Sequence, residues 1–72
     1  MTLDKVKYGQ RFKIIHIPNE SIKMQTIRFG ISEGESLLCD EVIPAGPIII
    51  RKNRQQLAIG RHLAAKIKVE LD

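Results

Sequence analysis

The sequence predicts an all-β fold with one short helix, on the basis of three observations. Apolar and polar residues alternate with the period of a β-strand in five short segments. The helical period occurs in one segment, approximately residues 21–29. Most apolar residues are Ile, Leu and Val, which favour strands, whereas the chain has one Tyr, two Phe and no Trp. Five short strands and one helix in 72 residues indicate a small antiparallel barrel of the Greek-key or SH3-like type, in a single domain over residues 1–72.

The first strand follows a short lead-in that ends in a turn at Gly9. We predict this strand at residues 11–17, with Phe12 and Ile14 on its inward face. The last residue of the segment breaks the alternation, which predicts a β-bulge near residues 15–16. Such a bulge bends a strand, as the wall of a small barrel requires.

The single helix begins after Pro18, which cannot donate a hydrogen bond to a strand ladder. Asn19 or Ser21 is expected to cap its N-terminus. The residues at helical spacing on the inward face are Ile22, Thr26 and Phe29. Gly30 then ends the helix, because a glycine readily adopts the left-handed conformation that terminates helices.

The second half of the chain supplies four more strands, predicted at residues 35–43, 48–52, 56–60 and 67–71. A loop at residues 44–47 and a tight hairpin turn at residues 53–54 separate the first three. A helical turn containing Leu63 and Ala64 leads into the last. The predicted core consists of Phe12, Ile14, Ile22, Phe29, Leu37, Ile48, Ile50, Leu57, Ile59, Leu63, Ile67 and Val69.

Motifs for common enzyme chemistry are absent from the chain. There is no GxxxxGKS or GxxxxGKT loop, no CxxC pair and no HExxH segment. The serines, Ser21, Ser32 and Ser36, do not occur in a nucleophile-elbow context, and the two histidines fall on separate predicted elements. A nucleophile, a base and an orienting group cannot all be named, so we expect neither an enzyme nor a bound cofactor.

Five residues offer side chains that bind metals: His16, Cys39, Asp40, Glu41 and His62. Cys39 lies in an apolar strand and is interpreted as a small buried hydrophobe, and the two histidines are interpreted as solvated residues. Asp40 and Glu41 are adjacent in a strand, so their side chains point to opposite faces unless a bulge intervenes. The sequence therefore predicts no dedicated metal site.

The chain is basic, with 12 Lys and Arg, 8 Asp and Glu, and a net charge of +4. Small barrels with this balance also bind nucleic acids, and cations gather at residues 5–13, 51–54 and 66–68. Binding of single strands usually adds exposed aromatic rings, and Tyr8 is the aromatic residue left outside the predicted core. We therefore favour a solvated basic face over a nucleic-acid surface and over a surface for an acidic protein or lipid headgroups.

Cysteine content and apolar runs indicate the compartment. The single cysteine cannot form an internal disulfide, and no signal peptide precedes the first periodic segment. The apolar runs are far shorter than the roughly 20 residues that span a bilayer. We expect a cytoplasmic protein without stable membrane insertion.

Several segments together resemble the FeoA family. They are Phe29-Gly30-Ile31 with Gly34, Gly46-Pro47, Leu57-Ala58-Ile59 and Ala64-Ala65-Lys66-Ile67-Lys68-Val69. The resemblance covers nearly the whole chain. The family usually carries an Arg-Leu pair shortly before a helix-ending Leu-Gly, where this chain has Gln25-Thr26 and Phe29.

This resemblance implies a small cytosolic accessory or regulatory protein of ferrous-iron uptake. Its implied partner is the cytosolic part of FeoB, a membrane transporter with a GTPase domain. Two alternatives stay open at this point, a nucleic-acid-binding small β-barrel and a detached metalloregulator-type SH3-like domain. The sequence leaves open whether the protein forms a homo-oligomer.

We predict that the partner binds at the rim of the barrel, over three segments. The residues are Lys23, Met24 and Gln25 on the helix, Ser32 and Glu33 in the turn after it, and Pro44, Gly46 and Pro47 in the loop between the second and third strands. Met24 has two interpretations, because Met fills gaps in cores and also adapts to varied partners. We favour the core interpretation.

Overall fold

The computed structural model describes all 72 residues of the protein. Its elements are η1 (a 3-10 helix, Leu3–Lys5), β1 (Arg11–His16), α1 (Glu20–Arg28), β2 (Ser36–Val42), β3 (Ile48–Lys52), β4 (Gln55–Ile59), α2 (Arg61–Ala64) and β5 (Lys68–Leu71). Each predicted strand is present within about one residue of its expected bounds, and the predicted helical turn is α2. Neither α-helix has the length and apolar character needed to cross a membrane.

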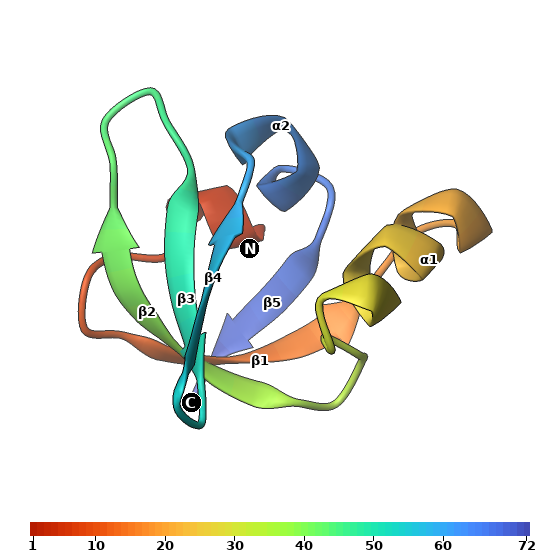
Figure 1. Cartoon of the computed structure of the whole chain (residues 1–72), viewed down its shortest axis with the longest axis horizontal. Helices are drawn as coiled ribbons and strands as arrows, with labels where there is room; N and C mark the ends of the chain where they lie inside the picture. Colours follow the sequence, from red (N-terminus) through yellow and green to blue (C-terminus); the bar gives the residue numbers. More distant parts are fainter.

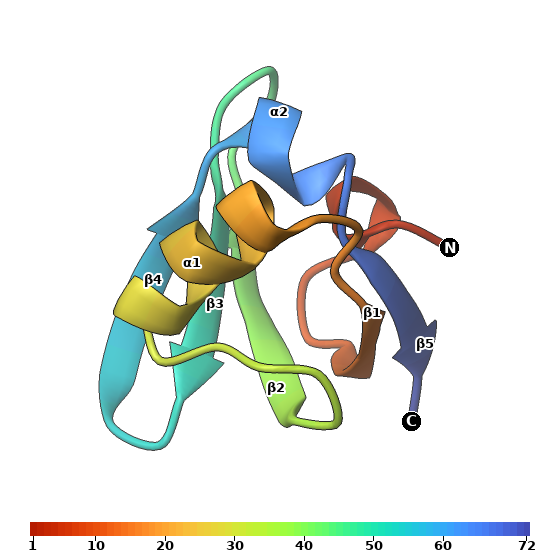
Figure 2. The same cartoon turned by 90° about the vertical axis from the view of Figure 1, so that its right-hand side faces the viewer.

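The five strands form one curved antiparallel sheet in the order β4-β3-β2-β1-β5. Figure 1 shows η1 and α2 at one end of this sheet, and α1 standing to one side of it. Figure 2 shows β4 and β5 as the outer strands on opposite sides of the molecule. The predicted fold, five antiparallel strands with one short helix, is confirmed.

Two irregularities in the strand pairing bend the sheet. The register of β1 against β5 shifts between Ile14 and His16, which confirms the predicted bulge. A second shift, between Cys39 and Glu41, occurs where β2 pairs with β3. A bulge inserts an extra residue into one strand and increases the local twist. The first bulge turns the chain so that Ile17, just after β1, is buried with 2% of its surface exposed.

The core contains 15 buried apolar residues, contributed by every element of the protein. They are Leu3, Val6, Phe12, Ile14, Ile17, Ile22, Ile31, Leu37, Cys39, Ile48, Ile50, Ile59, Ala64, Ile67 and Val69. The predicted core residues Leu57 and Leu63 are half-buried at its margin. Leu3 and Val6 lie three residues apart around η1, in the lead-in to which the sequence analysis assigned no core role.

The predicted burial of Phe29 is wrong, because 42% of its surface is exposed. Phe29 is the C-cap of α1, and Gly30 follows with φ of 77°. The amide of Gly30 donates to Ile27 O at 2.8 Å, and that of Ile31 donates to Thr26 O at 2.9 Å. This pair of bonds is a Schellman motif, which packs the residue after the glycine against the last helical turn. Ile31 therefore enters the core in place of Phe29.

Candidate functional site

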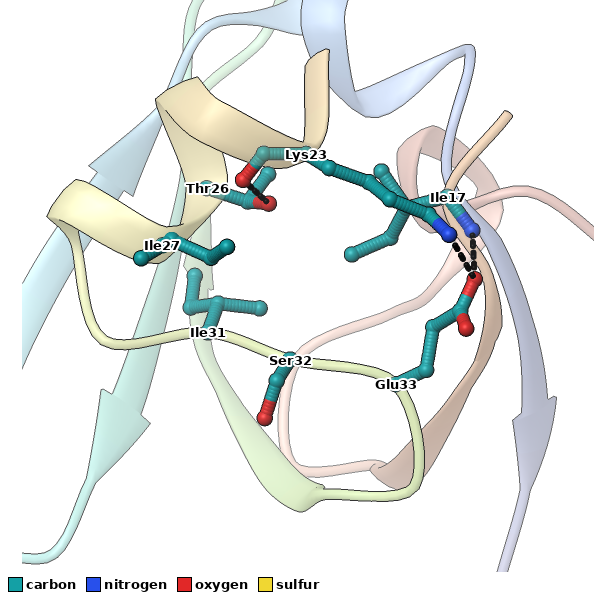
Figure 3. A pocket seen from close by; sticks show the side chains of 7 residues that line it. All are labelled: Ile17, Lys23, Thr26, Ile27, Ile31, Ser32 and Glu33. Carbon is teal, nitrogen blue, oxygen red and sulfur yellow. Dashed lines mark hydrogen bonds and ion pairs between the residues drawn. The ribbon is translucent and has the colours of Figure 1, made fainter. Parts of the chain in front are cut away.

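The protein has a cavity of about 250 Å³ between α1 and the segment that follows it. Its lining residues are Ile17, Lys23, Thr26, Ile27, Ile31, Ser32 and Glu33. Figure 3 shows the side chains of Ile17, Ile27 and Ile31 pointing toward the middle of this space. Lys23 and Glu33 reach toward each other at its side. The cavity thus combines an apolar interior with a charged rim.

Helix α1 forms one wall because its sequence fixes both its start and its buried face. Asn19 caps the helix, as one of the two predicted alternatives, and its side chain accepts a 2.9 Å hydrogen bond from the amide of Ile22. Ile22 and Thr26 are the buried residues of the helix. On its outer side, 60% of the surface of Met24 and 64% of that of Ile27 are exposed.

Glu33 ties the loop wall of the cavity to the chain before α1. Its Oε2 accepts a 2.8 Å hydrogen bond from the amide of Ile17, and it lies 3.8 Å from Lys23 Nζ and 3.5 Å from His16 Nδ1. The backbone amide of Ile17 is the main cause that lowers the pKa of Glu33, and the positive charges of Lys23 and His16 add to it. A charged Glu33 thus joins segments 16 residues apart in the sequence.

The loop wall is also fastened on its far side. The amide of Gly34 donates to Ile14 O at 2.8 Å, and Lys52 Nζ lies 2.7 Å from Glu35 Oε1 and also donates to Gly30 O. The hydrogen bond that Lys52 donates to Glu35 is the main cause that lowers the pKa of Glu35. These contacts fix the segment opposite α1, so the cavity exists before any partner arrives.

The structure brings together three of the predicted partner-binding residues at the cavity. Lys23, Ser32 and Glu33 line the cavity, and Met24 and Gln25 lie on the same short helix with their side chains exposed. The favoured interpretation of Met24 as a core residue is wrong, because it falls outside the stripe formed by Ile22 and Thr26. Met24 is instead exposed, as the other interpretation predicted.

The predicted loop residues Pro44, Gly46 and Pro47 do not join this cluster. Arg61 of α2 holds their loop, because its Nε donates to Gly46 O and its Nη2 to Ile43 O, both at 3.1 Å. The loop accordingly lies toward α2, while α1 stands elsewhere (Figure 1). A Cβ atom on Gly46 would come within 2.9 Å of Ile43 Cγ2, so a substitution at Gly46 changes the loop itself. The single predicted surface is therefore two separate places.

The five residues considered as metal ligands are dispersed. His16 lies beside Glu33, His62 is exposed on α2, and Cys39 is buried in the core, where burial raises the pKa of its thiol. A bulge does occur at Cys39 and Glu41, but Asp40 Oδ2 accepts hydrogen bonds from Gln56 Nε2 and from Arg51 Nη2. These two bonds lower the pKa of Asp40. No three His, Cys, Asp or Glu side chains are grouped as a metal ion requires.

The cations at the β3–β4 hairpin are largely engaged within the protein. Arg51 lies 2.9 Å from Asp40, and Lys52 is paired with Glu35. Arg54, at the tip, has no ion pair. Phosphate binding releases counterions only where cations are available to it. Of the three cations in this hairpin, Arg54 is thus the one that is available without breaking an ion pair.

Sequence analysis missed the apolar residues of the site, Ile17, Ile27 and Ile31, and assigned the polar Thr26 to the inward face of the helix without a role in the site. The sequence did contain a signal for Ile27. Met24 and Ile27 are three residues apart and lie off the buried stripe of α1, a spacing that places two apolar side chains on one exposed helix face. Ile17 and Ile31 lie in separate connections, and no local pattern relates them.

Comparisons with known proteins agree with this structure. The FeoA domain family model matches residues 1–71, whereas no curated protein matches the chain. A crystal structure of an iron uptake regulatory protein (FeoA) superposes with a TM-score of 0.89 at 25% identity, over 99% of this chain and 96% of that chain. The FeoA protein from Chlorobium tepidum has a TM-score of 0.83 at 26% identity, over 99% of this chain and 70% of that chain.

The manganese regulator SloR shares the fold alone. Its TM-score is 0.87 at 22% identity, and the match covers 99% of this chain but 34% of that chain. The fold therefore also occurs as one part of a larger protein.

Proposed function

Because the chain belongs to the FeoA family of small proteins associated with ferrous-iron transport, we propose that it acts in the cytoplasm as an accessory protein of iron uptake. In this proposal it works as one domain over residues 1–72, through binding and without catalysis or a resident metal. Its partner is the cytosolic part of a FeoB-type transporter. The binding site is the surface around the α1 cavity.

The cavity is the observation that carries this proposal. An apolar space of about 150 Å³ is known to hold a benzene ring. The α1 cavity, which is open to solvent and measures about 250 Å³, therefore has the volume for an aromatic or branched side chain of a partner. It is smaller than the roughly 300–1,000 Å³ of typical small-molecule sites. Next to it, Met24 and Ile27 expose apolar surface that a partner can cover.

The arrangement has the form of a protein interface. Apolar anchors in the centre of an interface supply most of the binding energy, and a polar rim excludes water from them. Buried Ile17 and Ile31 form the floor of this apolar centre, Ile27 supplies its exposed surface, and Lys23 and Glu33 form the rim. The ion pair between partly exposed Lys23 and Glu33, at 3.8 Å, contributes little to stability by itself, so Lys23 remains available to a partner's polar atoms while Glu33 keeps its bond to the amide of Ile17.

Binding to the purified cytosolic domains of the cognate FeoB, measured by calorimetry with and without guanine nucleotide, tests this proposal. We expect Met24→Asp and Ile27→Asp each to weaken binding at least tenfold, because each places a charge on the exposed apolar face of α1 beside the cavity. Tyr8→Asp is the matched control, since Tyr8 is 72% exposed and lies in the turn before β1. Equal affinities for all three variants would overturn the assignment of the site.

Cells that depend on this protein for ferrous-iron uptake provide a second measurement. We expect reduced uptake with Met24→Asp and normal uptake with Tyr8→Asp. Normal uptake with both, together with submicromolar RNA binding at physiological salt, would instead support a nucleic-acid-binding barrel. Such binding would weaken steeply as salt rises, because it depends on phosphate contacts.

A further inference from the structure

The two edges of the sheet are treated differently by the fold. At the β5 edge, the first three residues of the chain cover the strand. The amide of Val69 donates to Met1 O at 2.8 Å, the Met1 ammonium donates to Val69 O at 3.3 Å, and Thr2 pairs with Lys68. The amide of Leu3 donates to Ile67 O at 2.9 Å. The backbone groups of this edge are therefore largely paired.

The β4 edge lies on the opposite side of the molecule from β5 (Figure 2), and no strand other than β3 pairs with β4. β4 pairs with β3 through a two-residue turn, with Lys52 opposite Gln55. In an antiparallel ladder, the backbone N–H and C=O groups of one residue point toward the partner strand, and those of the next residue point away from it. Counting from the turn, Gln56 and Ala58 direct these groups away from β3. No hydrogen bond outside the ladder reaches the backbone of residues 55–59.

The β4 edge also lacks the features that usually block strand pairing. Proteins protect edges with charged residues, proline or bulges. Residues 55–60 contain no charge and no proline, and β4 pairs with β3 in regular register. The Gln56 side chain is turned back to Asp40, and Ala58 is small. The other edge strand, β5, carries Lys68 and Glu70.

We propose that β4 binds an extended segment of a partner protein, which adds to the sheet as a sixth, antiparallel strand. The N–H and C=O groups of Gln56 and Ala58 supply the backbone hydrogen bonds of this strand addition. Half-buried Leu57 meets an apolar residue of the segment, on the inner face of the sheet. This surface is separate from the α1 cavity, and the inference does not depend on the proposed function.

Charge identifies a partner segment, rather than a second copy of this chain, as the occupant. In a symmetric pairing of two β4 strands centred on Leu57, Arg54 of one copy faces Gly60 of the other and comes beside Arg61. Two chains of net charge +4 also repel each other. A segment with acidic residues at its ends instead complements Arg54, which has no ion pair.

A short synthetic peptide tests the proposal. The probe is the blocked peptide Asp-Thr-Val-Thr-Val-Thr-Asp, and the readouts are NMR titration and amide hydrogen exchange of the intact protein. We expect exchange at Gln56 and Ala58 to slow upon binding, and a version of the peptide with lysine at both ends to bind more weakly. Protection confined to α1 residues, or equal binding of the two peptides, would contradict the proposal.

Two further measurements separate backbone pairing from simple surface contact. Ala58→Pro removes an outward N–H and leaves the β3 ladder intact, whereas the control Ala58→Ser keeps that N–H. We expect binding to fall about tenfold with proline and to be unchanged with serine. If the proline variant fails to fold, the wild-type protein is tested with a peptide that is N-methylated at the amides expected to bond to β4. We expect this peptide to bind about tenfold more weakly than the unmethylated peptide.

Other outcomes have definite meanings. Undiminished binding of the N-methylated peptide would overturn strand addition. Protection of Gln56 and Ala58 that rises with protein concentration in the absence of peptide would identify a second copy as the occupant and overturn the choice of partner. Met24→Asp is expected to leave peptide binding intact, so a failure of this inference is distinguishable from a failure of the proposed function.

Discussion

The sheet and helix α1 differ in how much of their sequence is buried. In β3, Ile48 and Ile50 are fully buried on the inward face. In α1, two of the nine residues are buried, and Met24 and Ile27 are more than half exposed. Regions with few buried apolar contacts open at lower free energy than the core. The sheet therefore carries most of the stability of the protein, while α1 is held locally by its caps and by Glu33 and keeps an exposed apolar face.

The largest effect is expected from truncating the sheet side of this comparison. Ile67 is fully buried, so Ile67→Ala should lower the free energy of unfolding by roughly 2–5 kcal/mol. Ile27→Ala removes the same atoms from a side chain that is 64% exposed. This variant should change the free energy of unfolding by about 0.5 kcal/mol or less. Urea unfolding measures both. Equal effects would contradict the proposed division between sheet and helix.

A smaller effect is expected from the N-cap of α1. Asn19→Ala removes the hydrogen bond to the amide of Ile22 and should cost about 1 kcal/mol. Ser21→Ala is the matched control, because Ser21 is exposed within the first turn and makes no cap bond. If α1 opens independently of the sheet, hydrogen exchange in α1 will accelerate in the Asn19 variant while the strands stay protected.

Acidification should also act on the segment after α1, through Glu33 and Glu35, and on strands β2 to β4, through Asp40. The folded-state pKa values of Glu33 and Glu35 lie below the ordinary value of 4.5, and that of Asp40 lies below 3.8. The unfolded chain therefore takes up protons first, so these carboxylates contribute stability above their unfolded pKa values. That contribution is lost as pH falls through their folded values.

Variants of these carboxylates measure the effect. Glu33→Gln should reduce the loss of stability on acidification, and Glu41→Gln, whose carboxylate forms no ion pair, should leave the wild-type profile. Thermal melts from pH 7 to pH 3 provide the comparison. A steeper acid loss in Glu33→Gln than in the wild type would show that Glu33 does not act in this way.

The smallest change in stability is expected for Met24→Asp. Met24 is 60% exposed and belongs to no buried cluster, so the free energy of unfolding should stay within about 0.5 kcal/mol of the wild type. Circular dichroism melts measure this directly. A large destabilisation would place Met24 in the packing of α1, and would return it to the core role that its sequence position also allowed.

Local patterns in the sequence determined most of the fold. Period-2 alternation located the five strands, and the break at residues 15–16 located the bulge. Asn19 as a cap, Gly30 at a positive φ of 77° and the hairpin tip, with Asn53 at a φ of 55°, were also predictable. Each of these depends on the chemistry of residues only a few positions apart, and short-range sterics and hydrogen bonding decide it.

Only the tertiary structure decided how the predicted partner surface is divided. Pro44, Gly46 and Pro47 were grouped with α1 because all of them are rim residues, but Arg61 draws their loop to α2. The α1 cavity depends on Ile17 and Ile31, which no periodic pattern joins, and on the bond from Ile17 to Glu33. Phe29 fits the helical period, yet the turn after α1 buries Ile31 instead. The physical reason is that such contacts join residues far apart in the chain, and packing in the folded state selects among local alternatives of similar free energy.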